Sequence, residues 1–99
     1  MKKIMLVCSA GMSTSLLVTK MMKAANDQGM AIEIFACSES EAKAKYNDVD
    51  IILLGPQVRF LLSKIQKAVE AKGTPVAVID SIDYGTMNGP KVLEKALKL

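Results

Sequence analysis

Histidine and tryptophan are absent from this sequence, and arginine occurs only once. Without histidine, a Cys–His hydrolase is excluded, and the usual zinc sites, which combine cysteine with histidine, are hard to build. The four aromatic residues and the scattered lysines form no basic stripe with rings on which bases could stack. Despite the net charge of +3, the sequence therefore does not predict nucleic-acid binding.

Cysteine is also scarce, and Cys8 and Cys37 lie at the ends of two separate apolar runs. Disulfide frameworks in small domains usually contain more cysteines at shorter spacing, so we expect two reduced thiols. No apolar run approaches the ~20 residues of a membrane span, and the short run after Met1 only faintly resembles a signal peptide. We therefore expect a cytoplasmic protein that reaches the inner face of a membrane only transiently, through a partner.

The chain does contain enough apolar sequence for one globular domain over residues 1–99. Hydrophobic residues make up 51% and charged residues 23%, which argues against disorder. Four short apolar runs recur, at residues 4–7, 32–35, 51–54 and 76–79. The first, third and fourth runs are continuous, as in strands buried on both faces of a parallel sheet. The second run alternates more, which is typical of an edge strand.

Helical patterns fill the gaps between these runs. Two of them have a clear apolar face and are followed by glycine. Two others are marked by caps, because Ser38 with Glu41 forms a capping box and Asn88 stands just before a proline. The predicted helices cover residues 13–28, 38–45 and 58–71 and the stretch that begins at Asn88.

This alternation of strands and helices predicts an α/β fold with right-handed crossovers. We expect an open, parallel, four-stranded sheet with strand order 2-1-3-4 and helices on both faces, as in a truncated flavodoxin-like fold. Ligands of such sheets lie beyond the carboxyl ends of the strands, at the switch point of the strand order. That point falls between the first and third strands, so the loop after the first strand is the candidate site.

This loop combines a nucleophile with small and hydroxyl-bearing residues. Small side chains let backbone N–H groups converge on an anion, Gly11 permits a positive φ, and the start of the next helix adds unpaired N–H groups. Cys8 stands at the mouth of this phosphatase-like phosphate loop, which favours the nucleophilic thiolate. We interpret Cys8 as the catalytic residue, and the residues that follow as phosphate-binding: Ser9, Ala10, Gly11, Met12, Ser13, Thr14 and Ser15.

Other phosphate and thiol motifs do not match this loop. It lacks the lysine of GxxxxGK[ST], the spacing of GxGxxG and the second cysteine of CxxC. A cysteine-dependent phosphatase would need arginine six residues after Cys8 to clamp the phosphoryl oxygens, and Thr14 stands there. Asp80 and Asp83 could supply a general acid but are more simply explained as a turn and the approach to the next helix. The loop therefore predicts a protein that holds a phosphoryl group rather than hydrolysing it.

The sequence resembles the IIB components of the lactose/cellobiose-type sugar phosphotransferase system in three stretches. These are Cys8-Ser-Ala-Gly-Met-Ser-Thr-Ser-Leu-Leu-Val18, then Ile51-Ile-Leu-Leu-Gly-Pro-Gln57, then Val78-Ile-Asp-Ser81 with Tyr84-Gly85. The resemblance covers nearly the whole chain and places the active-site cysteine of the family at Cys8. It implies a phosphotransferase in which a phosphohistidine of a IIA protein phosphorylates Cys8. The phosphocysteine would then phosphorylate a β-linked disaccharide held by the membrane permease IIC.

Several points stay open at this stage. Gln57 could hydrogen-bond the phosphoryl group or cap the next helix, Tyr84 could pack beside the loop, and Met12 could be a docking contact or a core lid. Cys37 is interpreted as structural. No cofactor and no metal are expected. A phosphatase and a non-catalytic phosphate sensor remain alternatives, and the sequence does not say whether the sugar is of the lactose, cellobiose or chitobiose type.

Overall fold

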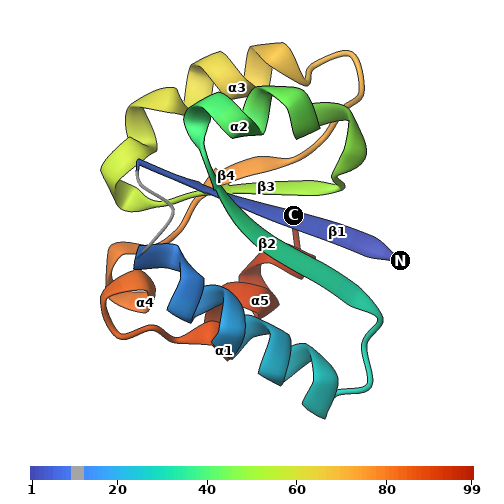
Figure 1. Ribbon diagram of the computed structural model, residues 1–99, viewed down its shortest axis with the longest axis vertical. Helices are drawn as coiled ribbons and strands as arrows, with labels where there is room; N and C mark the ends of the chain where they lie inside the picture. Colours follow the sequence, from blue (N-terminus) through green and yellow to red (C-terminus); the bar gives the residue numbers. More distant parts are fainter. Residues whose placement is uncertain (10–12) are drawn as a thin grey trace.

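The computed structural model describes residues 1–9 and 13–99, and its strands form one parallel four-stranded sheet. The strand order is β2-β1-β3-β4, so the predicted fold class and topology are confirmed (Figure 1). The strands are β1 (Lys2–Cys8), β2 (Ile32–Ser38), β3 (Ile51–Leu54) and β4 (Val76–Val78).

Helices cover both faces of this sheet (Figure 1). The first face carries α1, α4 and α5, and the second carries α2, α3 and two 3-10 helices, η1 and η2. Their bounds are α1 (Ser13–Asp27), α2 (Glu39–Ala42), η1 (Lys43–Asp48), η2 (Pro56–Leu61), α3 (Leu62–Ala68), α4 (Ser81–Gly85) and α5 (Gly89–Leu97).

The central strand β1 contributes to the core on both of its faces. Ile4 and Leu6 belong to the cluster under α1 and α5, whereas Met5 and Val7 belong to the cluster under α3. All four side chains are fully buried. Successive side chains of a strand point to opposite faces, so a continuous apolar run fits a strand that is covered on both sides. This packing holds the carboxyl end of β1, and with it Cys8, in a fixed place.

The fourth apolar run forms β4, in the last place of the predicted strand order 2-1-3-4. β4 pairs only with β3 and lies at an edge of the sheet. Val76 and Val78 pack against one core cluster and Ala77 against the other, yet all three are only partly buried. Both faces of β4 are thus covered as predicted, but its outer edge is not. The alternating second run does form the opposite edge, as predicted.

The predicted helix over residues 58–71 is divided in two. The chain first forms η2, and the α-helix α3 covers only Leu62–Ala68. Val58 has φ −117° and ψ 24°, which is not helical and kinks the segment. Val58, Leu61 and Ile65 are nevertheless buried in the same cluster. Their shared burial explains why the apolar spacing resembles one continuous helix.

The remaining differences between the predicted and the observed helices concern short helices with capped ends. The segment over residues 38–45 is also divided, into α2 and η1, but its capping box is confirmed. The Ser38 Oγ accepts a hydrogen bond from the Glu41 amide at 3.4 Å, and the Glu41 carboxylate accepts one from the Ser38 amide at 3.2 Å. The single-turn helix α4 is not predicted from the sequence, because five residues are too few to show a helical period.

Gly89 packs directly against the backbone of α1. Asn88 caps α5 by accepting a hydrogen bond from the Lys91 amide at 3.2 Å, and Gly89 follows as its first residue. A Cβ atom at Gly89 would lie 2.5 Å from the carbonyl carbon of Lys20 and 2.7 Å from the amide nitrogen of Met21. Both are backbone atoms inside α1, so a side-chain rotation cannot relieve the overlap. Only glycine allows the two helices to pack this closely.

We expect Gly89→Ala to lower the free energy of unfolding by about 1–3 kcal/mol, the usual cost of forcing extra atoms into a packed contact. Gly85→Ala is the matched control, because a Cβ atom there meets nothing within 4 Å. Its effect should stay within about 0.5 kcal/mol or be slightly stabilising. Urea unfolding followed by circular dichroism measures both variants. Equal stability of the two would contradict the close packing at Gly89.

Candidate functional site

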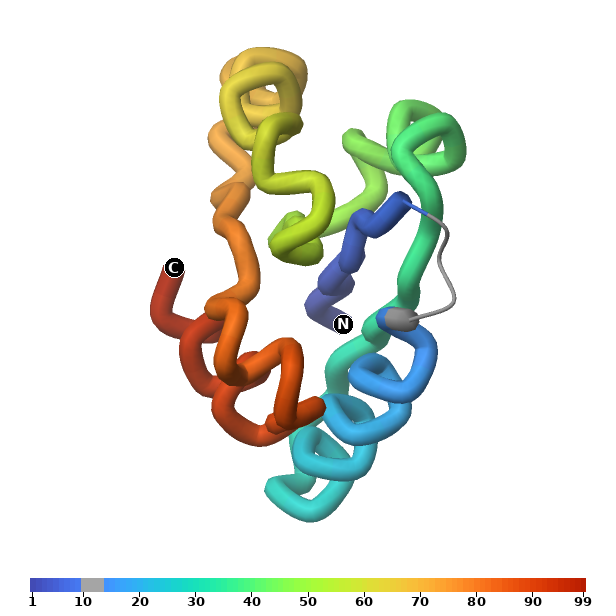
Figure 2. Tube along the Cα trace, turned by 90° about the vertical axis from the view of Figure 1, so that its left-hand side faces the viewer, coloured from blue at the N-terminus to red at the C-terminus, as the bar shows by residue number. Residues whose placement is uncertain are grey.

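Cys8 is the last residue of β1 and lies at the carboxyl edge of the sheet, where the strand order reverses. Its side chain is only 1% exposed. Ser9 follows as an exposed bend, and α1 begins at Ser13. Figure 2 views the molecule from this side, with the end of β1 and the start of α1 facing the reader. Ala10, Gly11 and Met12, which are predicted to bind phosphate, lie outside the described residues.

Thr14 makes direct contact with the candidate nucleophile. Its Oγ1 lies 3.1 Å from the Cys8 Sγ, within hydrogen-bonding distance, and the Thr14 side chain is fully buried. The first turn of α1 places this hydroxyl beside the end of β1. The Cys8 Sγ also lies 3.9 Å from the backbone carbonyl oxygen of Cys37 on the neighbouring strand. The position that would hold arginine in a phosphatase thus holds a hydroxyl directed at the sulfur. Ser15 follows on the exposed side of the same helix.

Gln57 and Tyr84, the two predicted neighbours of the loop, are brought together by the fold. The Gln57 Nε2 donates a hydrogen bond to the Tyr84 Oη at 3.0 Å, which joins the segment after β3 to the segment after β4. A Cβ atom at Gly55 would lie 2.7 Å from the Gln57 Oε1 and 3.7 Å from the Cys8 Cβ. The carboxamide of Gln57 therefore lies over the backbone of Gly55, on the side of Cys8.

The place of Gly55 beside Cys8 and Gln57 is not apparent from the sequence. The Gly55 amide donates to the Val7 carbonyl at 2.9 Å, which ties the loop after β3 to the end of β1. A larger residue here would displace Gln57, because its Cβ would overlap the Gln57 oxygen. The sequence signal is the Gly-Pro-Gln run directly after an apolar strand, but the run alone does not show which residue approaches Cys8.

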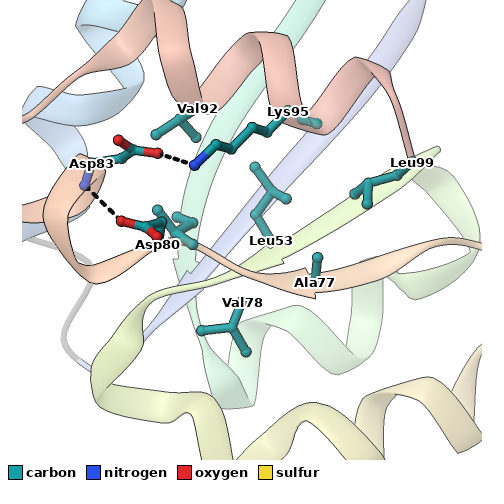
Figure 3. A pocket seen from close by; sticks show the side chains of 10 residues that line it. Leu53, Ala77, Val78, Asp80, Asp83, Val92, Lys95 and Leu99 are labelled. Atoms are coloured by element: carbon teal, nitrogen blue, oxygen red, sulfur yellow. Dashed lines mark hydrogen bonds and ion pairs between the residues drawn. The ribbon is translucent and has the colours of Figure 1, made fainter.

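Asp80 and Asp83 are both engaged in structural contacts (Figure 3). The Asp80 carboxylate caps α4 by accepting hydrogen bonds from the amides of Ile82 at 2.9 Å and Asp83 at 3.2 Å. These hydrogen bonds hold the pKa of Asp80 below its usual value. Asp83 is buried and forms an ion pair with Lys95 at 2.7 Å. These contacts agree with a structural role for both aspartates, but Asp80 caps the short helix α4 and Asp83 lies in it, whereas the sequence predicts a turn and the approach to the next helix.

Cys37 is the second cysteine and lies on β2, the strand beside that of Cys8. It is buried in the core cluster on the second face of the sheet, beside Val7 in the β1–β2 register. Burial, together with the negative charge of Glu41, raises the pKa of Cys37 to about 11. Its thiol is therefore protonated near neutral pH, as expected for a structural cysteine. Both cysteines are thiols, so the prediction that they form no disulfide is confirmed.

The strand order, together with a cysteine at the switch point, defines a class of small parallel α/β domains that carry a cysteine at the end of the first strand. The chain belongs to the family described as the lactose/cellobiose-specific IIB subunit of the sugar phosphotransferase system, whose model matches residues 3–95. It is therefore a IIB component of a cellobiose/lactose-type sugar phosphotransferase. In the described residues, no helix is long and apolar enough to cross a membrane.

Three curated relatives are each 48% identical to this chain. They are the oligo-β-mannoside-specific EIIB component of Bacillus subtilis, and the cellobiose-specific and galactose-specific EIIB components of two Lactococcus lactis strains. The alignment covers 100% of this chain and 96% of the Bacillus protein, and 99% of this chain and 95% of each Lactococcus protein.

Solved structures show the same fold. The cellobiose-specific IIB protein of Borrelia burgdorferi is 41% identical, with a TM-score of 0.80 over 98% of this chain and 89% of that one. The lactose-specific IIB domain of Streptococcus pneumoniae has a TM-score of 0.83 over 98% of this chain and 95% of that one. At 20% identity, the second comparison concerns the fold alone.

Proposed function

We propose that Cys8 carries the phosphoryl group between a phosphorylated IIA protein and a sugar bound by the IIC permease. The observation that carries the proposal is the Cys8 thiol at the end of the central strand, in contact with Thr14 at the start of α1. In the first step the Cys8 thiolate attacks phosphorus, an S–P bond forms and the N–P bond of the phosphohistidine breaks. In the second step a sugar hydroxyl forms an O–P bond, loses its proton, and the thiolate leaves.

Thr14 suits both steps. When the sulfur is a thiolate it can only accept hydrogen bonds, so the Thr14 hydroxyl becomes the donor at 3.1 Å. This hydrogen bond orients the sulfur and stabilises the charged form that attacks and later leaves. The first turn of α1 also directs backbone N–H groups towards the carboxyl end of β1, where an anion is favoured.

The same contacts argue against a phosphatase. Thr14 is fully buried where a phosphatase would place its arginine, so a long cationic side chain does not fit there without rearrangement. Asp80 and Asp83 are committed to the cap of α4 and to Lys95, which leaves neither well suited as a general acid. A carrier needs to bind the phosphoryl group without stabilising the attack of water on it.

The sugar is proposed to be a β-linked disaccharide of the cellobiose, chitobiose or lactose type, selected by the permease. The three curated relatives are named for three different sugars, although each is equally identical in sequence to this chain. The pocket beside β4, lined by Leu53, Val92 and Leu99 among others, has a volume of about 50 Å³ (Figure 3). Small-molecule sites are usually several hundred Å³, so this pocket is too small for a disaccharide.

The carrier role predicts a long-lived phosphoprotein. After phosphorylation by a IIA protein, the label on this chain should persist for minutes in buffer, because hydrolysis lacks the general acid that contributes ~10²–10⁴-fold. It should leave rapidly once permease vesicles and sugar are added. Labelled phosphate provides the measurement, with an aryl phosphate as a separate substrate. Loss of the label within seconds, or brisk hydrolysis of the aryl phosphate, would make the protein a phosphatase, and no labelling at all would support a phosphate sensor.

A further inference from the structure

The side chain of Gln57 is exposed, yet one hydrogen bond orients it beside the candidate nucleophile. Gln57 lies in η2, the segment after β3. Its Nε2 donates to the Tyr84 Oη at 3.0 Å, and its Oε1 lies over the backbone of Gly55. A Cβ atom at Gly55 would lie 2.7 Å from this Oε1 and 3.7 Å from the Cys8 Cβ, so both groups border the space that a side chain would fill. Glycine leaves that space open between the Gln57 carboxamide and Cys8.

Helix capping does not explain the position of Gln57. The sequence leaves open whether Gln57 caps the next helix, but the start of η2 receives no hydrogen bond from a side chain. In the described part of the chain, the hydrogen bond to Tyr84 is the only one that the Gln57 side chain makes. An ordered glutamine loses rotamer freedom, which one hydrogen bond at the surface barely offsets. The contribution of Gln57 to stability is therefore small, and a role in the site is the better explanation.

Tyr84, in contrast, is held firmly by the fold. Its ring is buried in the core cluster under α1 and α5. Asp80 caps the start of α4, the helix that carries Tyr84, and Asp83 in the same helix forms its ion pair with α5 at 2.7 Å (Figure 3). The chain leaves α4 through Met87, whose φ of 53° is uncommon for a residue other than glycine. The Tyr84 hydroxyl is thus a fixed point against which the Gln57 carboxamide is oriented.

The hydrogen bond between these two side chains can form in either direction. A tyrosine hydroxyl is both a donor and an acceptor, whereas a carboxamide has a donor end and an acceptor end. In the structure the donor end of Gln57 faces Tyr84 and the acceptor end lies towards Gly55. Half a turn about the Cγ–Cδ bond exchanges the two ends, and the Tyr84 hydroxyl then donates to the Oε1. Phosphoryl oxygens are acceptors, so only the turned carboxamide presents them with an N–H donor.

We propose that Gln57 binds the phosphoryl group carried by Cys8 and that Tyr84 is the positioning residue for its carboxamide. This inference rests on the proposed function of Cys8. Once the S–P bond has formed, the carboxamide turns over, an Nε2–H donates to a phosphoryl oxygen and the Oε1 accepts a hydrogen bond from Tyr84. The opposite turn follows when the phosphoryl group leaves for the sugar. An amide keeps its protons at neutral pH, so Gln57 stabilises the phosphocysteine without acting as a general acid in its hydrolysis.

The first test measures how labelled phosphate divides at equilibrium between this chain and a lactose/cellobiose-type IIA protein phosphorylated on histidine. Gln57→Glu keeps the size of the side chain and can still accept a hydrogen bond from Tyr84, but it has no N–H donor. The equilibrium constant for phosphorylation of this chain should fall about tenfold, as expected for a lost hydrogen bond to a charged group. Gln66→Glu, at an exposed position of α3, is the matched control and should equal the wild type. A role of Gln57 in tying η2 to α4 predicts instead that Gln57→Glu, which keeps this link, equals the wild type.

Tyr84→Phe tests the positioning role, because it removes the hydroxyl and keeps the buried ring. The same equilibrium constant should fall about 2–10-fold, the effect of a hydrogen bond between neutral groups. Added to Gln57→Ala, the substitution should cause no further fall, since Tyr84 acts through Gln57. Falls of equal size with and without Gln57 would show that Tyr84 acts independently and would overturn the pairing.

The second test is the NMR signal of the Gln57 side-chain amide in nitrogen-labelled protein. Gln28 and Gln66, which are exposed in other helical segments, serve as references within the same spectrum. Phosphorylation of Cys8 should shift the Gln57 signal and leave those of Gln28 and Gln66 in place. An unmoved Gln57 signal, or a wild-type equilibrium constant in Gln57→Glu, would overturn the inference. Failure of the proposed function gives a different result: the wild-type protein would then accept no label on Cys8 at any donor concentration.

Discussion

Cys8→Ser should reduce phosphorylation by the IIA donor to background while leaving the fold and its stability nearly unchanged. A serine hydroxyl is far less acidic than a thiol, whose ordinary pKa is ~8.5, so the nucleophilic anion is lost. Serine is close in size to cysteine and can keep a hydrogen bond with Thr14, whose Oγ1 lies 3.1 Å from the sulfur. Transfer of labelled phosphate measures the first effect, and circular dichroism with urea unfolding measures the second.

The control is Cys37→Ala, which removes the other thiol and leaves a small apolar residue in the core. It should retain transfer at nearly the wild-type rate, because Cys37 is buried on the second face of the sheet and stays protonated. Its cost is in stability, since the side chain it removes is packed in a buried cluster. If Cys8→Ser accepts phosphate at the normal rate while Cys37→Ala does not, the assignment of the site to β1 and its loop is wrong.

Thr14→Val should lower the rate of phosphoryl transfer by about 10–100-fold. The substitution keeps the shape of the buried side chain but removes the hydroxyl 3.1 Å from the sulfur. A hydrogen bond to a charged group contributes about 1.5–3 kcal/mol, which corresponds to this range of rates. Single-turnover labelling with saturating IIA donor is the measurement, because it separates the chemical step from docking.

Thr14→Ser provides the matched control, since it keeps the hydroxyl and loses only a methyl group. We expect it to recover most of the rate, although it leaves a small void in the packing against the end of β1. A merely structural role for Thr14 predicts the opposite order, with the bulkier valine more active than serine. Equal rates for the wild type and Thr14→Val would show that the Thr14 hydroxyl has no part in transfer.

Local patterns predict most of the architecture. Continuous apolar runs mark strands that are covered on both faces, and β1 fits this pattern, with Ile4 to Val7 fully buried. Helix caps can also be recognised within a few residues. A helix begins as predicted at the capping box of Ser38 and Glu41, and another begins at Asn88. Four strands linked by helices allow only a few topologies, and the predicted order β2-β1-β3-β4 is one of them. This order places Cys8 at the switch point of the sheet.

Patterns within one segment cannot specify what depends on contacts between segments. The continuous apolar run of β4 predicts a strand buried on both faces, yet its residues are only partly buried because β4 has a neighbouring strand on one side only. The spacing over residues 58–71 resembles one helix because Val58 and Ile65 are buried in one cluster, although the backbone between them is kinked. Similarly, the overlap that excludes a side chain at Gly89 exists only because α5 packs on α1.

The sequence by itself determined the family and the sheet and predicts Cys8 as the nucleophile, because each of these depends on patterns within short stretches of residues. Only the tertiary structure decided which side chains meet at that nucleophile. Thr14 contacts Cys8 from only six positions away, but Gln57 meets Tyr84 across 27 positions. Parallel strands bring their carboxyl ends to one edge, and that edge forms only when the whole sheet is assembled.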